Sequence, residues 1–505
     1  MPVQVTYPGV YVQEIPSGSR AITGVATSIC AFVGRALRGP VEEPISISSY
    51  GDFERIFGGL WMESGLGYAV RAFYLNGGRD AVIVRLAGAN AAAAKFAGNF
   101  LPIEASGPGV WGNGLTATVA HPDDKEADVV AAAQGVPKNQ LFHLTLAAGE
   151  DREQYLNVTV VDGPRRVDRV LRSSTLAAVS GASLPNSRPA EAAKTATGGA
   201  DGDGLTDEAY VDDGFEDSKR GIYALEKADY FTLLCLPPPS PAADLPVALW
   251  ADALTYCKKR RAFLLVDPPA AEVVSSIKAW PGANGLLADG RNGALYFPRL
   301  RCPDPLRDGT VADFAPCGAV AGTIARVDGE RGVWKAPAGI DAGLAGVNGL
   351  TVTLTDSDSG ALNPIGINCL RTFRNTGTVV WGARTLRGAD GIADEYKYIP
   401  VRRLALYLEE SLFRGTQWVV FEPNDEPLWA QIRMSVGAFM QDLFRQGAFT
   451  GVTPRHAYFV RCDGETTSQF DRDRGIVNIT VGFAPLKPAE FVVITIQQKT
   501  ADAEA

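Results

Sequence analysis

The stretch YFTLLCLPPP (230–239), followed by LPVALWADALTYCKKRR (245–261) and AFLLVDPP (262–269), decides the fold class of this chain. The first and last segments are short apolar runs typical of buried strands. The middle segment spaces its apolar residues as a helix does and ends in basic residues, which the helix dipole favours. A second helix-like segment and a third apolar run repeat the pattern as far as Cys302. Strands that alternate with helices predict a parallel sheet with right-handed crossovers, so residues 211–360 are expected to form a middle α/β domain.

The regions around this domain differ from it in composition, charge and hydrophobic pattern. The chain has 505 residues, enough for about three domains, and its 46% hydrophobic and 21% charged residues are close to the average of soluble globular proteins. Residues 91–210 are rich in Ala and Gly and alternate weakly, and nearly all of the excess negative charge lies between residues 97 and 220, with 19 acidic against 11 basic residues. We interpret them as an inserted, acidic, mostly β outer domain. The last third returns to α/β patterning, so the whole chain is predicted to be a multidomain protein of the α/β (α+β) class.

Charge and composition exclude several classes of protein. A net charge of −9 argues against binding nucleic acid through its phosphates. No segment approaches the roughly 18 uninterrupted apolar residues of a spanning helix, and the start of the chain lacks the features of a secretory signal, so we expect folding in the cytoplasm and no membrane insertion. The seven cysteines are scattered without a C-x-x-C pair, which predicts reduced, mostly buried thiols.

Residues that could carry catalysis are sparse. Asp267 follows an apolar strand, where ligands of open parallel sheets bind, but a carboxylate that caps the next helix or ends a strand is the more common reason for such a residue. No phosphate-binding glycine loop or nucleophile motif lies nearby, and the histidines, His121, His143 and His456, are not at metal-ligand spacing. The acidic loop from Asp201 does not match a calcium-binding pattern. We therefore predict no catalytic residue, metal or cofactor, and keep an α/β enzyme with a ligand site near Asp267 as the alternative.

Two helices of the last third carry arginines whose role the sequence leaves open. In VRRLALYLEESLFR, Arg402 and Arg403 lie in the first turn, against the helix dipole, so they are either paired within the chain or dock onto a partner. In LWAQIRMSVGAFMQDLFRQGA, Arg433 and Arg445 lie opposite the apolar face, as on most solvated helices. The acidic residues of FEPNDEPLW directly before this helix are interpreted as its N-terminal cap.

Both ends of the chain are strand-like and apolar, and each is joined to the rest by a link that contains Pro or Gly. FVVITI near the C-terminus is apolar on both faces, so an exposed strand of this kind would aggregate. Either each end completes the sheet of its own domain, or each adds a strand to a neighbouring copy by β-augmentation. The second interpretation predicts that the protein is an assembly protomer. The residues concerned are Val3, Val5, Tyr7, Val10, Val12 and Ile15 at the start, and Phe491, Val492, Val493, Ile494 and Ile496 at the end.

Eight long motifs follow one another along the chain. In chain order they are TYPGVYVQEI (6–15), GIYALEKADYFTLLCLPPP (221–239), GVWKAPAG (332–339), LNPIGINCLR (362–371), WGARTL (381–386), YIPVRRL (398–404), TQWVVFEPNDEPLW (416–429) and VGFAPLKPAEFVV (481–493). This series resembles the contractile tail sheath proteins of phages and of extracellular contractile injection systems. The resemblance covers nearly the whole chain except roughly residues 91–210, where sheath proteins vary.

The resemblance implies a non-enzymatic subunit of a helical sheath, which surrounds an inner tube, is assembled on a baseplate and is closed by terminator or cap proteins. It further implies that the sheath contracts and drives the tube through a target envelope. Such a particle is assembled in the cytoplasm and then forms part of a virion tail or of an injection particle released from the cell.

The resemblance also assigns parts of the chain. It implies an inner, tube-facing domain built from residues 25–90 plus 361–484, an N-terminal β arm and linker over 1–24, and a C-terminal β arm over 485–505. The two arms would link neighbouring subunits. The arginines at 402, 403, 433 and 445 become candidates for contact with the tube.

Overall fold

The computed structural model describes residues 20–98, 100–181, 183–241 and 243–495. These residues form two compact units. We call Thr27–Glu330 with Pro337–Ile399 the body, and the described residues of the remainder, 20–26, Arg331–Ala336 and 400–495, the C-terminal unit.

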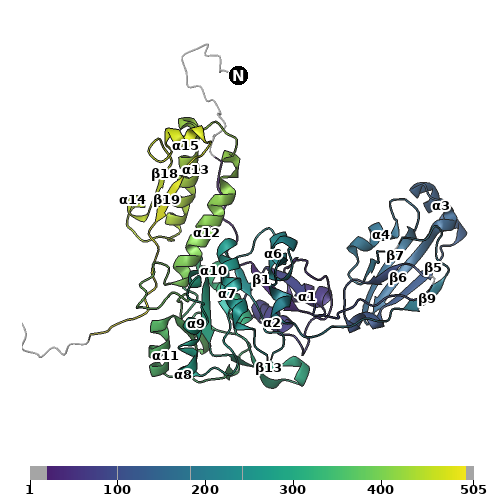
Figure 1. Cartoon of the computed structure of the whole chain (residues 1–505), viewed down its shortest axis with the longest axis horizontal. Coiled ribbons are helices and arrows are strands. Elements are labelled where there is room, and N and C mark those ends of the chain that lie inside the picture. The colour runs from purple at the N-terminus through teal and green to yellow at the C-terminus, as the bar shows by residue number, and fades with distance from the viewer. Residues whose placement is uncertain (1–19, 99, 182, 242, 496–505) are drawn as a thin grey trace, which may run out of the picture. The chain divides into compact units, whose positions relative to one another are not determined.

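The body is built on a mixed sheet of eight strands (Figure 1). Its six inner strands are parallel, and an antiparallel strand closes each edge. The predicted parallel α/β arrangement is therefore present, and the mixed α/β class is confirmed. In spatial order the strands are β17 (Gly377–Trp381), β16 (Ile367–Phe373), β12 (Gly293–Phe297), β11 (Phe263–Val266), β10 (Leu233–Cys235), β1 (Cys30–Arg35), β3 (Ala81–Leu86) and β2 (Ile45–Ile47).

The inner strands are apolar at nearly every position because helices cover both faces of the sheet. Alternate residues of β1 point to opposite sides. Ala31 belongs to the same buried cluster as Trp250 of the helix after β10, whereas the ring of Phe32 lies 5.5 Å from that of Phe73 on the other face. The covering helices are α1 (Tyr50–Phe57), α2 (Leu66–Leu75), α7 (Val247–Lys259) and α10 (Cys317–Arg331), with the shorter α5 (Asp207–Tyr210), α6 (Phe215–Ser218), α8 (Val274–Ile277), α9 (Trp280–Ala283) and α11 (Asp356–Leu362) around them.

Helices α2 and α10 approach each other closely because α10 presents glycine at the contact. A Cβ atom on Gly318 would lie 2.1 Å from the carbonyl oxygen of Ala69, and one on Gly322 would lie 2.3 Å from that of Phe73. Beside α2 lies a small antiparallel sheet of β14 (Thr310–Phe314), β13 (Leu300–Asp304) and β15 (Gly349–Leu350).

The sheet joins segments that the resemblance assigned to different domains. Of the proposed inner domain, residues 25–90 and the strands β16 and β17 of 361–484 share the sheet with strands of the middle domain, whereas residues 400–484 belong to the other compact unit. The physical reason is that buried parallel strands are all short apolar runs, and such runs do not encode which neighbour each of them selects.

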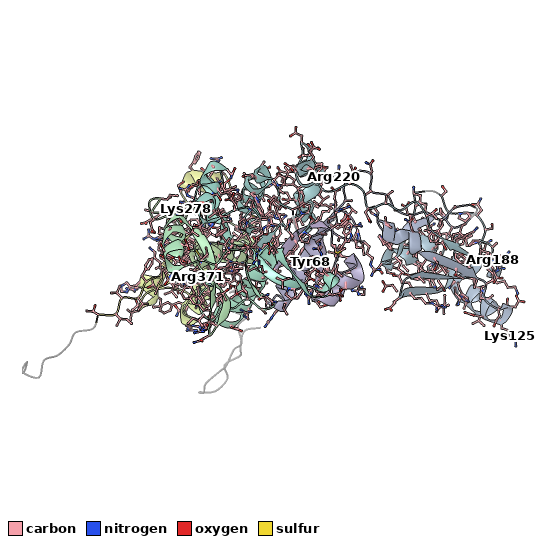
Figure 2. All side chains as sticks on the ribbon, turned by 90° about the horizontal axis from the view of Figure 1, so that it is seen from below. Tyr68, Lys125, Arg188, Arg220, Lys278 and Arg371 are labelled. Carbon is pink, nitrogen blue, oxygen red and sulfur yellow. The ribbon has the colours of Figure 1, made fainter. Side chains whose placement is uncertain are left out.

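The region between β3 and α5 has a core of its own. Four antiparallel strands pack their apolar faces around Phe142, Leu144 and Leu146, all fully buried. Figure 2 marks Lys125 and Arg188, two of its basic side chains. The elements are β4 (Ile103–Ala105), β5 (Thr116–Ala120), α3 (Asp124–Gln134), β6 (Leu141–Ala148), β7 (Asp151–Thr159), α4 (Val167–Val170), β8 (Ala177–Val179) and β9 (Ala192–Thr195), with the order β7-β6-β5-β9 in the larger sheet and β4-β8 in the smaller.

The C-terminal unit is organised by two helices, α12 (Ile399–Gly415), whose first residue belongs to the body, and α13 (Glu426–Arg445). Leu404 and Leu408 of α12 pack with Ile432, Val436 and Met440 of α13. A ribbon of two antiparallel strands completes the unit, with α14 (Pro454–Ala457), β18 (Tyr458–Arg461), α15 (Gln469–Asp473) and β19 (Thr480–Phe483) in chain order.

Candidate assembly surfaces

The ribbon of β18 and β19, which we call the C-terminal ribbon, offers two open strand edges. Tyr458 pairs with Phe483 and Arg461 with Thr480, and among the described residues neither strand has another partner; pairing with Phe449 begins only beyond β19, at Pro485. One face of the ribbon packs towards α13, where the hydroxyl of Tyr458 donates to Oε1 of Gln441 at 2.8 Å. Open edges with unpaired N–H and C=O groups are templates for a further strand.

The outer face of the C-terminal ribbon is aromatic and basic. The ring of Phe459 lies over Gly482, its cross-strand partner, since a Cβ atom there would come within 2.2 Å of the ring. The guanidinium of Arg461 stands 5.4 Å from the centre of the same ring. Phe459 is 49% exposed, so this face has apolar area to bury.

The segment after the C-terminal ribbon leaves the unit. Ala484 is the last residue held by a backbone hydrogen bond on both sides, with its N–H donating to Ala457 and its carbonyl accepting from Thr450. Phe491, Val492, Val493 and Ile494 follow with 74%, 81%, 88% and 80% of their surface exposed, and no described strand pairs with them. Of the other residues predicted to form intersubunit strands, Val3, Val5, Tyr7, Val10, Val12, Ile15 and Ile496 lie outside the described residues.

Asp267 is a helix cap inside the body. Its side chain is 5% exposed, and its Oδ1 accepts a hydrogen bond of 2.9 Å from the backbone N–H of Cys317, the first residue of α10. Burial raises the pKa of Asp267 to about 6, against the opposing effects of the Cys317 hydrogen bonds and of Arg299. The adjoining cavity holds only about 10 Å³, space for no more than a water molecule. The geometry favours a structural role and gives the enzyme alternative no substrate site.

The histidines lie apart from one another and from any cluster of ligands. The Nδ1 atom of His143 accepts from the backbone of Asn157, and the ring of His121 contacts the carbonyl of Pro189. Within the described ranges, no three Cys, His, Asp or Glu side chains stand close enough to hold a metal ion. In the same residues, no helix combines the length and apolarity needed to cross a bilayer.

The arginines of α12 are engaged within the chain. The side chain of Arg402 is 12% exposed and its Nη1 lies 3.2 Å from Oε1 of Glu409, while Arg403 is only 3% exposed. The acidic residues two turns further along thus offset the unfavourable position of Arg402 in the first turn. Neither side chain is displayed on the surface of this unit.

The arginines of α13 differ from each other. Arg433 donates to the carbonyl of Cys462 and forms an ion pair of 2.5 Å with Glu426, so it joins α13 to the end of β18. Arg445 is 72% exposed and only 3.6 Å from Asp442. Of the four arginines predicted to contact a tube, Arg445 is therefore the most exposed, and its long ion pair with Asp442 also lies in solvent.

The acidic residues before α13 do cap it, as predicted. Asp425 is the N-cap residue, and its side chain accepts from the backbone N–H of Glu426 at 2.8 Å. The sequence analysis missed what precedes them. Phe421 is fully exposed and has φ of +72°, and Val420 beside it is 64% exposed. The only signal in the sequence is an apolar pair directly before the capping residues.

Two family models match the chain. The model described as "Phage tail sheath protein central domain" matches residues 204–386, and the one described as "Phage tail sheath C-terminal domain" matches residues 393–499. Together the two ranges cover more than half of the 505 residues.

Two curated relatives are both described as a tail sheath protein. The protein of Vibrio phage KVP40 is 30% identical over 190 residues, which cover 37% of this chain and 27% of that protein. The chain thus spans about a quarter of this relative. The protein of Burkholderia phage BcepMu is 24% identical over 452 residues, which cover 88% of this chain and 87% of that protein.

Several solved structures share the fold. The helical sheath of the anti-feeding prophage in the contracted state matches with a TM-score of 0.60 and 23% identity, over 98% of this chain and 100% of that one. The sheath complex of an extracellular contractile injection system, PVC, also in the contracted state, gives 0.58 and 23% over 99% of both chains. A sheath tail protein from Listeria innocua gives 0.59 and 15% over 92% of this chain and 96% of that one. With both sheath domains matched in order and the whole fold shared with sheath subunits, this chain belongs to the contractile tail sheath protein family, whose members are structural proteins and not enzymes.

Proposed function

We propose that this protein polymerises into a helical sheath around an inner tube, and that contraction of the sheath drives the tube through a target envelope. The observation that carries the proposal is that the chain has both an exposed, unpaired apolar segment and open strand edges. The segment Phe491–Ile494 is apolar on both faces and exposed, while the C-terminal ribbon has two open edges. An edge and an unpaired strand of this kind satisfy each other by β-augmentation.

The numbers of edges and arms support a lattice. Two open edges can receive two strands, and the chain has two candidate arms, the segment Val3–Ile15 and the segment from Phe491. If each arm goes to a different neighbour, the contacts are heterologous, and heterologous contacts continue into rings or helices. We therefore infer that the C-terminal ribbon is the acceptor of arms from neighbouring copies.

Contraction follows from the mechanics of such links. Strand pairing between copies resists separation, while the Pro-containing link between Ala484 and Phe491 absorbs changes in φ and ψ as the units rotate. The free energy comes from lattice contacts that are better satisfied in the contracted state, and each subunit needs only a small difference because many switch together. No nucleotide or cofactor has a role in this scheme.

The proposed partners follow the same order of assembly. The sheath forms in the cytoplasm around a tube, on a baseplate and beneath a terminator or cap, and becomes part of a phage tail or of a released injection particle. Neither nucleic acid nor direct membrane insertion has a part in it. Arg445 is the residue we assign to contact with an acidic patch of the tube, because it is exposed at the end of α13 and its nearest acidic neighbour is also mostly exposed.

Deletion of the arms tests the proposal. A chain without residues 1–15, and separately one without residues 490–505, should remain folded and monomeric but form no ordered sheath in negative-stain electron microscopy. The intact chain should form striated tubes. A matched control replaces the exposed Val452, which belongs to neither arm, by Ser and should leave the tubes unchanged. Normal tubes from either deleted chain would show that the arms do not hold the lattice together.

A further inference from the structure

The turn before α13 presents an aromatic side chain to solvent in a strained backbone conformation. Phe421 has φ of +72° and is fully exposed, and a left-handed conformation is uncommon for a bulky residue. The turn is fixed by backbone hydrogen bonds from Val419 to Thr416, from Val420 to Gln417 and from Glu422 to Val419. Trp418 anchors it on the core of the C-terminal unit. The ring of Phe421 is therefore held rigidly outward, and strain of this kind gathers at binding sites.

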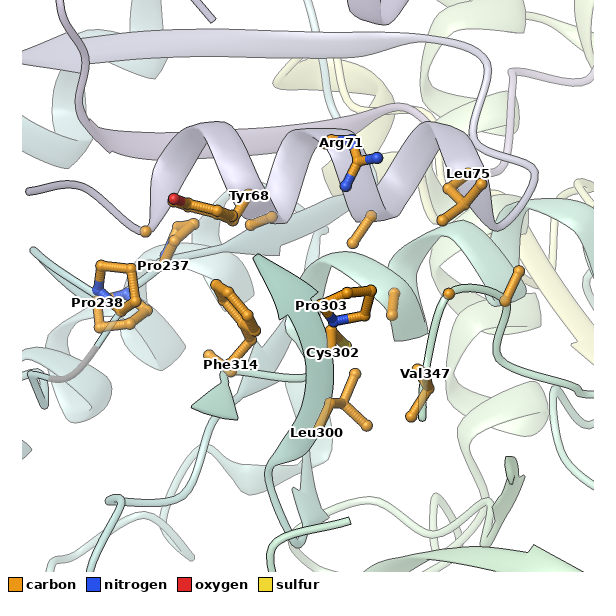
Figure 3. Close-up of a pocket in the computed structure, with 18 residues that line it drawn as sticks. Tyr68, Arg71, Leu75, Pro237, Pro238, Leu300, Cys302, Pro303, Phe314 and Val347 are labelled. Atoms are coloured by element: carbon orange, nitrogen blue, oxygen red, sulfur yellow. The ribbon is translucent and has the colours of Figure 1, made fainter. Parts of the chain in front are cut away.

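The body contains a separate apolar pocket between α2 and the small sheet of β13 and β14 (Figure 3). Tyr68 and Leu75 line it on the helix side, and Leu300, Cys302 and Phe314 line it on the sheet side. The ring of Tyr68 lies 4.9 Å from that of Phe314, and its hydroxyl donates to Asp304 at 2.9 Å, so the walls are fixed. Leu75 is 52% exposed at the edge.

The pocket has the size and lining that one phenyl ring requires. Its volume is about 120 Å³, close to the roughly 150 Å³ of an engineered apolar cavity that accepts benzene in another protein. It is open to solvent, so a ring attached to another chain can enter. The terminal segment Phe491–Ile494 suits it less well, because a strand that is apolar on both faces needs a strand edge and not a hole for one side chain.

Charges around the two features are of opposite sign. Glu422, next to Phe421, is exposed, and Asp425 and Glu426 follow it. Arg71 stands on α2 at the pocket (Figure 3), is exposed, and forms no ion pair with another described residue. Arg307, whose charge also acts on Tyr68, is 59% exposed and pairs with Asp304 at 3.4 Å. Opposite charges at the rim of a contact set its register and exclude wrong partners.

We propose that the ring of Phe421 of one copy inserts into the pocket between α2 and β13 of a second copy, with Glu422 facing Arg71. The contact is heterologous, since one surface patch meets a different one, and it therefore adds a link between copies that is independent of the exchanged arms. The inference rests on the proposed assembly into a sheath. It adds the residues that fix how one subunit sits on the next.

Cross-linking of mixed subunits tests the contact while Phe421 stays in place. One chain carries Val420→Cys, beside the ring, and the other carries Leu75→Cys, at the edge of the pocket. Both positions are exposed, so folding is not at risk. Sheaths assembled from the mixture and treated with bismaleimidoethane should give covalent dimers that contain one chain of each kind. All chains carry Cys302→Ser, which removes the free thiol that lines the pocket itself. Sheaths of either chain alone should then give none, which separates contact between copies from contact within one.

Two controls make the result specific. Val452→Cys is at a more exposed position than Val420→Cys and follows the C-terminal end of the 20-residue helix α13, whereas Val420 precedes its N-terminal end. The two ends of such a helix are about 30 Å apart. Mixed with Leu75→Cys, Val452→Cys should give no dimer. Adding Phe421→Asp to the Val420→Cys chain should abolish its dimers. Assembled sheaths in which Val420→Cys cross-links no better than Val452→Cys would overturn the inference.

A charge exchange gives an independent readout. Glu422→Arg and Arg71→Glu should each raise the concentration needed for assembly by about fivefold, the effect of one exposed ion pair. The double variant should return close to the unsubstituted protein. A double variant in which the two defects add would overturn the pairing. If the unsubstituted chain itself forms no tubes, the proposed function fails, whereas tubes without these cross-links contradict only the present inference.

Discussion

Two apolar stretches of this chain have nearly the same composition and opposite surroundings. Strand β3, AVIVRL, is buried at every position, whereas FVVI at Phe491–Ile494 is at least 74% exposed at every position. Strand β3 is buried by parts of the same chain, namely β1, β2 and the helices around them. No described residue covers the tail in the same way. The difference teaches that the body buries its own apolar strands, whereas the apolar tail of the C-terminal unit stays exposed in the single chain, as the proposed exchange of strands between copies requires.

The largest expected effect on stability comes from replacing an isoleucine by alanine in β3, compared with the same substitution in the tail. Ile83 in β3 is fully buried, so Ile83→Ala should lower the free energy of unfolding by about 2 to 5 kcal/mol. Ile494 is 80% exposed, so Ile494→Ala should change it by less than about 0.5 kcal/mol while reducing sheath formation. Denaturant unfolding of the monomer and electron microscopy measure the two effects. A tail substitution that destabilises the monomer as much as Ile83→Ala would remove the distinction.

The stability of the body should depend on pH through the buried carboxyl group of Asp267. Burial raises the pKa of Asp267 from 3.8 to about 6, so the folded state holds this proton more tightly than the unfolded state. Its stabilising contribution is fully present below pH 3.8 and is lost as the pH rises through about 6. Over that interval the loss is roughly 3 kcal/mol.

Asp267→Asn removes this titration. The stability of the variant relative to the unsubstituted protein should therefore rise by roughly 3 kcal/mol between about pH 3.5 and pH 7. Urea unfolding at a series of pH values measures the difference, and sheath formation serves as the control. A difference independent of pH would mean that Asp267 is not a buried cap, and a loss of assembly without loss of stability would revive a functional role.

A smaller loss of stability is expected when Arg85, which joins β3 to the start of the inserted region, is replaced. Arg85 of β3 is 3% exposed and donates to the carbonyls of Ala36, Gly39 and Pro108 at 3.0, 2.6 and 2.6 Å. Arg85→Met leaves these buried acceptors without a donor and should cost about 2 kcal/mol. Arg79→Met, at an exposed position two residues before β3, is the matched control and should have almost no effect. Equal thermal midpoints for the two variants would contradict the assignment.

The smallest effect on stability is expected for the exposed arginine of α13. Arg445→Ala should change the free energy of unfolding by less than about 0.5 kcal/mol, because the side chain is 72% exposed. If this residue contacts the tube, the variant should release its tube at lower salt than the unsubstituted sheath. Arg403→Ala, at a position only 3% exposed, should instead destabilise the monomer. Unchanged salt dependence in the Arg445 variant would leave the tube contact to other residues.

Much of the candidate site could be predicted from local pattern. The cap of α13 by Asp425 and the apolar character of the tail followed from residue types and spacing, as did the expectation that Asp267 caps a helix. The pairing of strands did not, and neither did the partner of Asp267, which lies 50 residues away at Cys317 and not in the next helix. The outward ring of Phe421 was missed because a left-handed phenylalanine has no signature in sequence.

The sequence by itself determined the α/β class, the capping of α13, the shortage of catalytic groups and the family. These depend on periodicity, capping residues and motifs, which act over a few neighbouring residues. Only the tertiary structure decided that β1 and β3 share a sheet with β10 and β16, that Arg403 is buried and Arg445 exposed, and that an apolar pocket lies beside α2. Those outcomes depend on contacts between residues far apart in the chain, and apolar runs of similar composition compete for the same places until packing selects among them.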